Sequence, residues 1–180
     1  MPSGPHARAT LILGGVRSGK SRLAERLARE SGLPVTYLAT ALPGDDEMRA
    51  RIAAHRARRP ADWNLVEEPL RLATTLSDVC AEGRCVLVEC LTLWLTNLLC
   101  GNDETRLQQE LDALATWLPT LPGQLIFVAN EVNMGVIPMD VLSRRYCDLA
   151  GTLHQTLATE CDRVILTVAG LPMLIKGAAP

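Results

Sequence analysis

A chain of 180 residues is long enough to bury one hydrophobic core, so a single domain over residues 1–180 is expected. Hydrophobic residues make up 48% and charged residues 21%, as in ordinary globular proteins, but aromatic residues at 3% are too few to stack single-stranded nucleic-acid bases. The formal net charge of -2 provides no general attraction to DNA or to an acidic membrane, so neither partner is expected and any bound anion must be held by local groups.

The sequence contains no recognisable membrane or targeting segment. No apolar run reaches the ~18 residues of a membrane-spanning helix, and the first nine residues have no hydrophobic signal-peptide core. The six cysteines form no CxxC pair and have no histidine at metal-ligand spacing, so we expect structural thiols. A cytoplasmic, reducing location is the corresponding expectation.

Short apolar runs alternate with longer helical patterns along the chain. In chain order, the sequence predicts strand 9–15, helix 21–30, strand 34–40, helices 45–58 and 69–82, strand 85–90, helices 91–99 and 104–118, strand 124–130, a helix within 138–161, strand 163–170 and a short strand at 173–176. Flexible loops are expected at 41–46, 100–104 and 131–138. Continuously apolar strands between helices indicate an α/β domain with a mostly parallel sheet and helices on both faces.

The turn between the first strand and the first helix carries a phosphate-binding motif. The stretch GGVRSGKS matches GxxxxGK[ST] in the context that this loop requires, after a strand and at the start of a helix. Its backbone N–H groups and the helix N-terminus are expected to hold phosphate oxygens, with Lys20 at the β- and γ-phosphates and the Ser21 hydroxyl on Mg²⁺. The predicted cradle comprises Gly14, Gly15, Val16, Arg17, Ser18, Gly19, Lys20 and Ser21.

Two polar residues end neighbouring apolar strands. Glu89 closes the run VLVE, and a carboxylate there costs free energy unless a metal ion or hydrogen bonds satisfy it. Glu89 is therefore predicted to be a Mg²⁺ ligand together with Ser21. Thr40 closes the second strand, where it either contacts a bound ligand or only terminates the strand.

The stretch RIAAHRARRP places one histidine among four arginines. On a helix, His55 shares a face with Arg51, Arg58 and Arg59, and the apolar residues Met48 and Ile52 lie near the same side. The spacing fits a structural histidine, and it also fits a nucleophile beside arginines that bind a triphosphate. In the second case the arginines lower the histidine pKa by like-charge repulsion and keep the imidazole neutral.

Several stretches together resemble one known family. LILGGVRSGKSRLAERLA, YLATA, DDEMRARIAAHRARRPADWNLVEEP, VLVECLTLWLTNLL, NEVNMGVIP, RRYCDLAGTLHQ and VAGLPMLIK follow one another as in the bifunctional adenosylcobinamide kinase / adenosylcobinamide-phosphate guanylyltransferase family of cobalamin assembly. The similarity covers roughly residues 10–176. The phosphate-binding loop alone is generic, whereas the block around His55 and the NEV stretch are far more specific.

The resemblance implies a RecA-like P-loop fold and a two-step enzyme. It implies phosphorylation of the aminopropanol hydroxyl of adenosylcobinamide by ATP or GTP, then transfer of GMP from GTP to that phosphate through a histidine, here His55. It also implies a homotrimer. Beyond the loop, the nucleotide-binding positions that it implies are Leu38, Ala39, Thr40, Arg56, Ala57, Arg58, Arg59, Glu67 and Glu89.

Three positions depart from the family pattern. Asn133 stands where the family usually has glycine, His154 where asparagine is common, and Cys147 where arginine is common. A glycine at position 133 permits a positive φ, so the path of the 131–138 loop is the feature that the first change affects. None of the three changes falls on the phosphate-binding loop, His55 or Glu89.

Two other functions are compatible with parts of the pattern. A monofunctional small-molecule or nucleotide kinase would use the same loop, with His55 structural and the arginines binding phosphates only. A GTPase switch usually carries an N-K-x-D signature, and the nearest stretch, NEVN at 130–133, lacks both the lysine and the aspartate.

Overall fold

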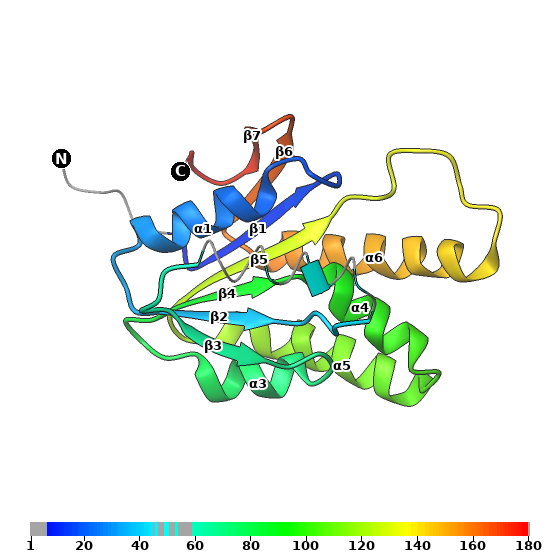
Figure 1. Ribbon diagram of the computed structural model, residues 1–180, viewed down its shortest axis with the longest axis horizontal. Coiled ribbons are helices and arrows are strands. Elements are labelled where there is room, and N and C mark those ends of the chain that lie inside the picture. The colour runs from blue at the N-terminus through cyan, green and yellow to red at the C-terminus, as the bar shows by residue number, and fades with distance from the viewer. Residues whose placement is uncertain (1–6, 45, 47–48, 51–52, 54–58, 180) are drawn as a thin grey trace.

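The computed structural model describes residues 7–44, 46, 49–50, 53 and 59–179 (Figure 1). The elements are β1 Ala9–Gly14, α1 Lys20–Glu30, β2 Val35–Ala39, β3 Asn64–Glu67, α3 Leu72–Val79, β4 Cys85–Glu89, α4 Leu91–Cys100, α5 Glu104–Trp117, the 3-10 turn η1 Leu118–Thr120, β5 Gln124–Asn130, α6 Val141–Glu160, β6 Arg163–Val168 and β7 Leu171–Lys176. Most of the helix predicted at 45–58 lies outside the described residues. Within that range the structure describes residues 46, 49, 50 and 53, and all four are helical.

One sheet of seven strands organises the molecule, in the order β3-β2-β4-β5-β1-β6-β7. The first six strands are parallel, and only β7 runs antiparallel to its neighbour β6. Parallel strands end at the same edge, so the loops after β1, β2, β4 and β5 share one side of the sheet. The mostly parallel sheet that the sequence predicts is confirmed.

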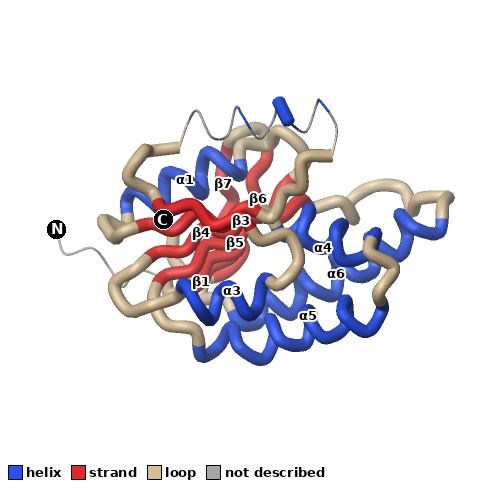
Figure 2. Tube along the Cα trace, turned by 60° about the horizontal axis from the view of Figure 1, so that its bottom comes forward, coloured by secondary structure: helices blue, strands red, loops and turns tan. Residues whose placement is uncertain are grey.

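Helices cover both faces of this sheet, as predicted, but unequally (Figure 2). Among the described helices, α1 packs alone on one face through Leu23 and Leu27, against Ile12 and Val128 of the central strands. Helices α3, α4, α5 and α6 cover the other face, where Trp94 and Phe127 are fully buried in the larger core. This two-sided core explains why the central strands are mostly apolar on both faces.

Two features of the sheet differ from the sequence predictions. Strand β3 was not predicted, because its four residues lie at the sheet edge, only half buried, with Leu65 and Val66 as its apolar residues. The predicted strand 163–170 ends at Val168, since Ala169 and Gly170 both adopt positive φ. Two such residues form the tight turn that suits a hairpin, and β7 returns from it starting at Leu171.

The cysteines are structural thiols, as the sequence predicts. Each of the six cysteines is a free thiol, and Cys80, Cys85 and Cys161 are buried. Burial raises the pKa of Cys85 to about 11, which keeps that thiol protonated. Within the described part of the chain, no helix combines the length and the apolar character needed to cross a membrane.

Candidate functional site

The phosphate-binding motif forms a tight loop between β1 and α1. A Cβ on Gly14 would lie 2.3 Å from the Thr167 carbonyl oxygen and 2.7 Å from the Ser18 hydroxyl, so only glycine fits there. Gly19 has φ +101° and caps α1 without a side-chain hydrogen bond. The first N–H groups of α1 therefore have no capping side chain to satisfy them, which is the property of an anion-binding helix N-terminus.

Lys20 is held inside this loop. Its side chain is only 7% exposed, and its Nζ donates a 2.7 Å hydrogen bond to the Gly15 carbonyl. Burial lowers the pKa of Lys20, and the nearby Glu89 carboxylate acts in the opposite direction by stabilising the ammonium. A buried cation within a cradle of backbone groups is suited to bind a phosphate, which would satisfy its charge.

Ser21 and Glu89 meet beside the lysine. The Ser21 hydroxyl donates to Glu89 Oε1 at 2.7 Å, so the first turn of α1 contacts the end of β4. In the described part of the chain, no group of three or more His, Cys, Asp or Glu side chains could hold a metal ion. A serine hydroxyl and one carboxylate next to a phosphate loop are instead the donor set that fits Mg²⁺, which keeps several waters and binds substrate phosphates.

The residues predicted on neighbouring strands lie in line across the sheet. Ala39 is paired in register with Glu67 of β3 on one side and with Glu89 of β4 on the other. The two carboxylate residues therefore flank the end of β2 at the same edge. This edge also holds the phosphate-binding loop, two strands beyond β4.

Leu38 and Thr40 have structural contacts at this edge. Leu38 is fully buried in the larger core, so its side chain is not accessible to a ligand. The Thr40 hydroxyl donates to the Cys90 carbonyl at 2.7 Å and accepts from the Cys90 N–H at 2.9 Å. These bonds join the ends of β2 and β4 and favour the strand-terminating interpretation of Thr40.

Of the arginines in the segment 51–59, the structure describes Arg59, the last one. The Arg59 guanidinium carbon lies 4.8 Å from the centroid of the Tyr37 ring, a cation–π contact with β2. Tyr37 belongs to the core on the α1 face of the sheet, so Arg59 lies on that face. The predicted positions His55, Arg56, Ala57 and Arg58 lie outside the described residues.

The ends of β5 and β6 complete the loop, and no phosphate-binding motif marks their residues. The Glu131 N–H donates to the Gly14 carbonyl at 3.0 Å, and the Gly170 N–H donates to the Ser18 carbonyl at 2.8 Å. The Thr167 carbonyl is the atom that leaves no room for a side chain at Gly14. Only the strand order, which places β1 between β5 and β6, brings these residues to the motif.

Two of the three departures from the family pattern, Cys147 and His154, lie in α6, and the third, Asn133, contacts this helix. The Asn133 side-chain amide donates to the Cys147 carbonyl at 3.1 Å, and its backbone N–H donates to Glu131 Oε1 at 2.7 Å. His154 Nδ1 lies 3.7 Å from Glu131 Oε2, and burial lowers the pKa of His154 whereas the carboxylate opposes this change. Asn133 does not adopt a positive φ, so this loop does not require glycine there.

Several known proteins are similar to this chain in sequence or in fold. Residues 10–175 match the family described as cobinamide kinase / cobinamide phosphate guanyltransferase. The bifunctional adenosylcobalamin biosynthesis protein CobP of Pseudomonas aeruginosa is 63% identical over 167 residues, which cover 93% of this chain and 96% of that protein.

Two solved structures resemble the fold at low sequence identity. The flagellar accessory protein FlaH of Methanocaldococcus jannaschii aligns with a TM-score of 0.51 and 14% identity, covering 94% of this chain and 78% of that one. The RadB recombinase aligns with a TM-score of 0.50 and 17% identity, covering 88% of this chain and 73% of the other. The expected RecA-like P-loop fold is thereby confirmed. The chain belongs to the cobinamide kinase / cobinamide phosphate guanyltransferase family and is a bifunctional kinase and guanylyltransferase of adenosylcobalamin biosynthesis.

Proposed function

We propose that the loop between β1 and α1 serves both activities of this enzyme, and that His55 carries the guanylyl group between them. The observation that supports a nucleotide site here is the group formed by Lys20, Ser21 and Glu89, with a buried ammonium and a 2.7 Å hydroxyl–carboxylate contact at one helix N-terminus. A single bound triphosphate would then be attacked at its γ-phosphorus by the acceptor hydroxyl and at its α-phosphorus by His55.

The kinase step is an in-line displacement at the γ-phosphorus of ATP or GTP. The aminopropanol hydroxyl of adenosylcobinamide attacks, its oxygen bonds to the γ-phosphorus, its proton is released, and the bond to the β-phosphate oxygen breaks. Lys20 and the loop N–H groups stabilise the charge on the phosphoryl oxygens, which is the main catalytic contribution in such reactions. Ser21 and Glu89 would hold Mg²⁺, which supplies further neutralisation of the phosphate charge when bound.

The guanylyl step uses the α-phosphorus of GTP. A His55 ring nitrogen attacks that atom, the bond to the bridging oxygen breaks and pyrophosphate leaves, which gives a phosphoramidate on the histidine. The phosphate of adenosylcobinamide phosphate then attacks the same phosphorus and breaks the P–N bond. Adenosylcobinamide-GDP forms and the imidazole is restored.

The other proposed nucleotide contacts surround this site. Arg56, Arg58 and Arg59 would bind phosphate oxygens, and Ala57 lies between them in the sequence. Glu67 and the backbone of Leu38, Ala39 and Thr40 would contact the nucleotide from the neighbouring strand ends. Because Leu38 is buried and the Thr40 hydroxyl is bonded to Cys90, only their main-chain atoms are proposed to do so.

The proposed assembly is a homotrimer that acts in the cytoplasm. The antiparallel strand β7 supports self-association, since its side chains are exposed although most are apolar, with Leu171 at 70% and Ile175 at 60%. A second copy of the chain would cover such a surface.

Three variants test the shared site. Lys20→Ala is expected to lower both kinase and guanylyltransferase rates by about 100-fold or more, because both steps need the bound triphosphate. His55→Ala is expected to abolish guanylyl transfer while most of the kinase rate is retained. Lys176→Ala is the matched control, because this second lysine donates to the Ala158 and Thr159 carbonyls instead. Loss of only one activity in Lys20→Ala would show that the two steps use separate sites.

A further inference from the structure

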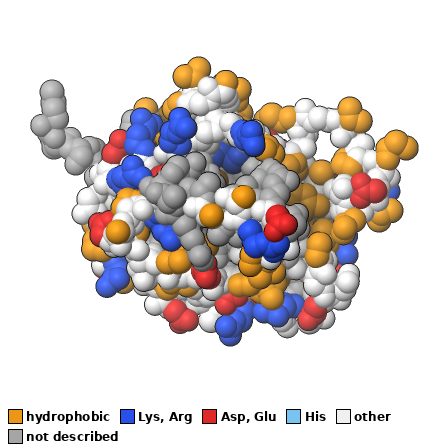
Figure 3. Space-filling view, viewed as in Figure 1, with side chains coloured by type: hydrophobic (Ala, Val, Ile, Leu, Met, Phe, Trp, Pro, Cys, Tyr) orange, Lys and Arg blue, Asp and Glu red, His pale blue; other side chains and the backbone are white. Residues whose placement is uncertain are grey.

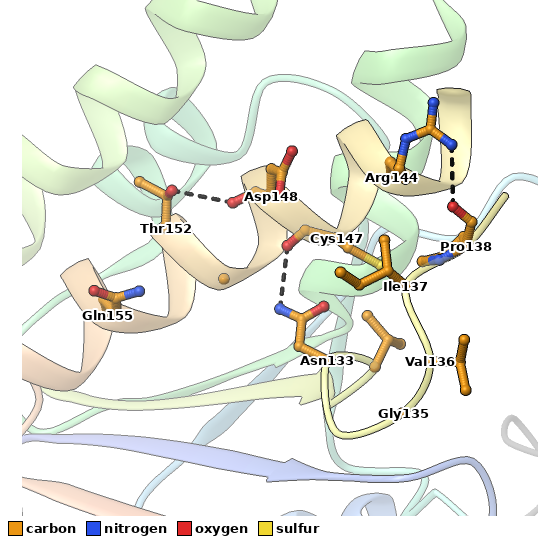
Figure 4. Close-up of a pocket in the computed structure, with 12 residues that line it drawn as sticks. Asn133, Gly135, Val136, Ile137, Pro138, Arg144, Cys147, Asp148, Thr152 and Gln155 are labelled. Carbon is orange, nitrogen blue, oxygen red and sulfur yellow. Dashed lines mark hydrogen bonds between the residues drawn. The ribbon is translucent and has the colours of Figure 1, made fainter. Parts of the chain in front are cut away.

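A cavity lies between the segment 132–138 and helix α6. It has a volume of about 480 Å³, in the range of small-molecule sites. In Figure 4, Asn133 and Ile137 of the loop lie near Cys147 of the helix, Thr152 and Gln155 lie further along the helix, and Val136 lies on the outer side of the loop.

The cavity begins directly after β5, whose end contacts the phosphate-binding loop. Gly14 is paired in register with Asn130 at the end of β5, and the Glu131 N–H donates to the Gly14 carbonyl at 3.0 Å. Val132, the next residue, already lines the cavity. A molecule bound there is therefore adjacent to a nucleotide held by Lys20 and the loop amides, at the same edge of the sheet (Figure 1).

Hydrogen bonds fix the shape of the 132–138 segment at both ends. At its start, Asn133 donates to the Cys147 carbonyl from its side chain and to Glu131 Oε1 from its backbone. At its end, the Arg144 guanidinium donates to the Pro138 carbonyl at 3.1 Å and also to the Met139 carbonyl. The segment is therefore preformed and projects from the domain instead of packing onto it.

Apart from Asn133, the side chains of the loop wall are apolar, and most of them are solvent-exposed. Val136 is 95% exposed and Ile137 77% exposed, and Figure 3 shows hydrophobic side chains gathered on this loop at the right of the view. The helix wall is polar, with Thr152, Gln155 and Asp148. A ligand that suits both walls has apolar surface together with groups that both donate and accept hydrogen bonds.

The charges of the cavity argue against a second phosphate site. Arg144 is its one cation among the lining residues, and its guanidinium already donates to two backbone carbonyls. Asp148 adds a negative charge that would repel phosphate oxygens. A neutral ligand rich in carboxamide groups agrees with this balance better than any nucleotide does.

We propose that this cavity binds the carboxamide-bearing rim of the corrinoid acceptor and thereby directs its aminopropanol hydroxyl toward the nucleotide. The proposal rests on the function proposed above, in which the loop after β1 holds the triphosphate. Apolar methyl groups of the macrocycle would contact Val136 and Ile137, and its amides would bond with Thr152, Gln155 and Asp148. The cavity holds only part of such a large ligand, which suits its open form.

Filling the cavity tests the proposal. Thr152→Trp places a large side chain in the cavity at an exposed position, and it is expected to raise the KM for adenosylcobinamide at least about tenfold, which is the effect of losing one good contact. The Kd for GTP and the yield of guanylylated protein are expected to stay unchanged, since neither involves the acceptor. Gln155→Ala, a smaller change at the same wall, is expected to raise the same KM in a correctly folded protein.

Thr159→Trp is the matched control. Thr159 lies two turns further along the same face of α6, is exposed, and donates to the carbonyl four residues earlier as Thr152 does, but it does not line the cavity. The proposed function is tested separately, by the loss of adenosylcobinamide phosphorylation in Lys20→Ala relative to the wild-type activity. With the wild-type activity present, an unchanged KM for adenosylcobinamide in both Thr152→Trp and Gln155→Ala would overturn the cavity assignment alone. This holds whether or not the oligomeric state of the variants changes.

Discussion

A buried ionisable side chain contributes to stability only in the protonation state that the fold accepts. His154 is 8% exposed and packs at the middle of α6, with Glu131 Oε2 at 3.7 Å from its Nδ1. Burial lowers the pKa of His154 below 6.5, and the carboxylate offsets only part of this effect. The folded protein therefore prefers the neutral ring, whereas the unfolded chain binds the proton more readily.

The sign of the pH effect follows from that preference. As the pH falls below about 6.5, the unfolded state gains a proton that the folded state resists, so the free energy of unfolding should decrease until the folded pKa is passed. His154→Asn, which restores the residue common in the family, should reduce this slope. Urea denaturation between about pH 7.5 and 5 measures it. Equal slopes in the two proteins would mean that His154 does not titrate in this range.

At the residue scale, site residues could be predicted from the sequence where their role depends on neighbours in the chain. The glycines, Lys20 and Ser21 follow one another in the chain, so their motif could be identified without the fold. Glu89 could be predicted because a carboxylate at the end of an apolar strand needs a partner, and Ser21 is that partner. The buried His154–Glu131 pair could not be predicted, because 23 positions separate two residues that only the packing of α6 brings together.

At the scale of elements, the central strands were predictable and the edge strand was not. Strands β1, β4 and β5 are buried on both faces, which makes their sequences mostly apolar. Strand β3 has exposed ends at Asn64 and Glu67 and gains its order from pairing with β2. Its four residues contain no pattern that distinguishes a strand from a loop.

The turn between β1 and α1 offers a matched pair of substitutions. Gly14→Ala would place its Cβ 2.3 Å from the Thr167 carbonyl oxygen, so β1 and β6 must separate or the loop must move. We expect the free energy of unfolding to fall by about 2 kcal/mol or more, as for other severe backbone clashes. Gly15→Ala introduces the same atom in the same loop, where nothing lies within 4 Å, and should change the stability by less than about 1 kcal/mol.

Urea denaturation of both variants measures the two changes in the free energy of unfolding. A large loss in Gly14→Ala with a small one in Gly15→Ala is the expected result. Equal stability in the two variants would show that β1 and β6 can separate at little cost. The close contact between Gly14 and the Thr167 carbonyl would then not determine the conformation of the loop.

At the scale of the whole molecule, the sheet order creates the site. Residues from the ends of β1, β4, β5 and β6 contact one another only because β1 lies between β5 and β6, two strands from β4. The sequence predicted a parallel sheet but not this order, so the Thr167, Gly170 and Glu131 contacts to the loop were missed. The cavity beside α6 was missed for the same reason, since a long loop and a distant helix form its walls.

The covalent step at His55 is the central claim and can be tested directly. Intact mass spectrometry of the pure protein after incubation with GTP and Mg²⁺ should show one added guanylyl group per chain. Acid should remove this group, because a phosphoramidate is acid-labile. Addition of adenosylcobinamide phosphate should also remove it. The same treatment of His55→Ala should leave the mass unchanged. Retention of the adduct in His55→Ala, or its absence in the wild-type protein, would contradict a histidine-borne intermediate.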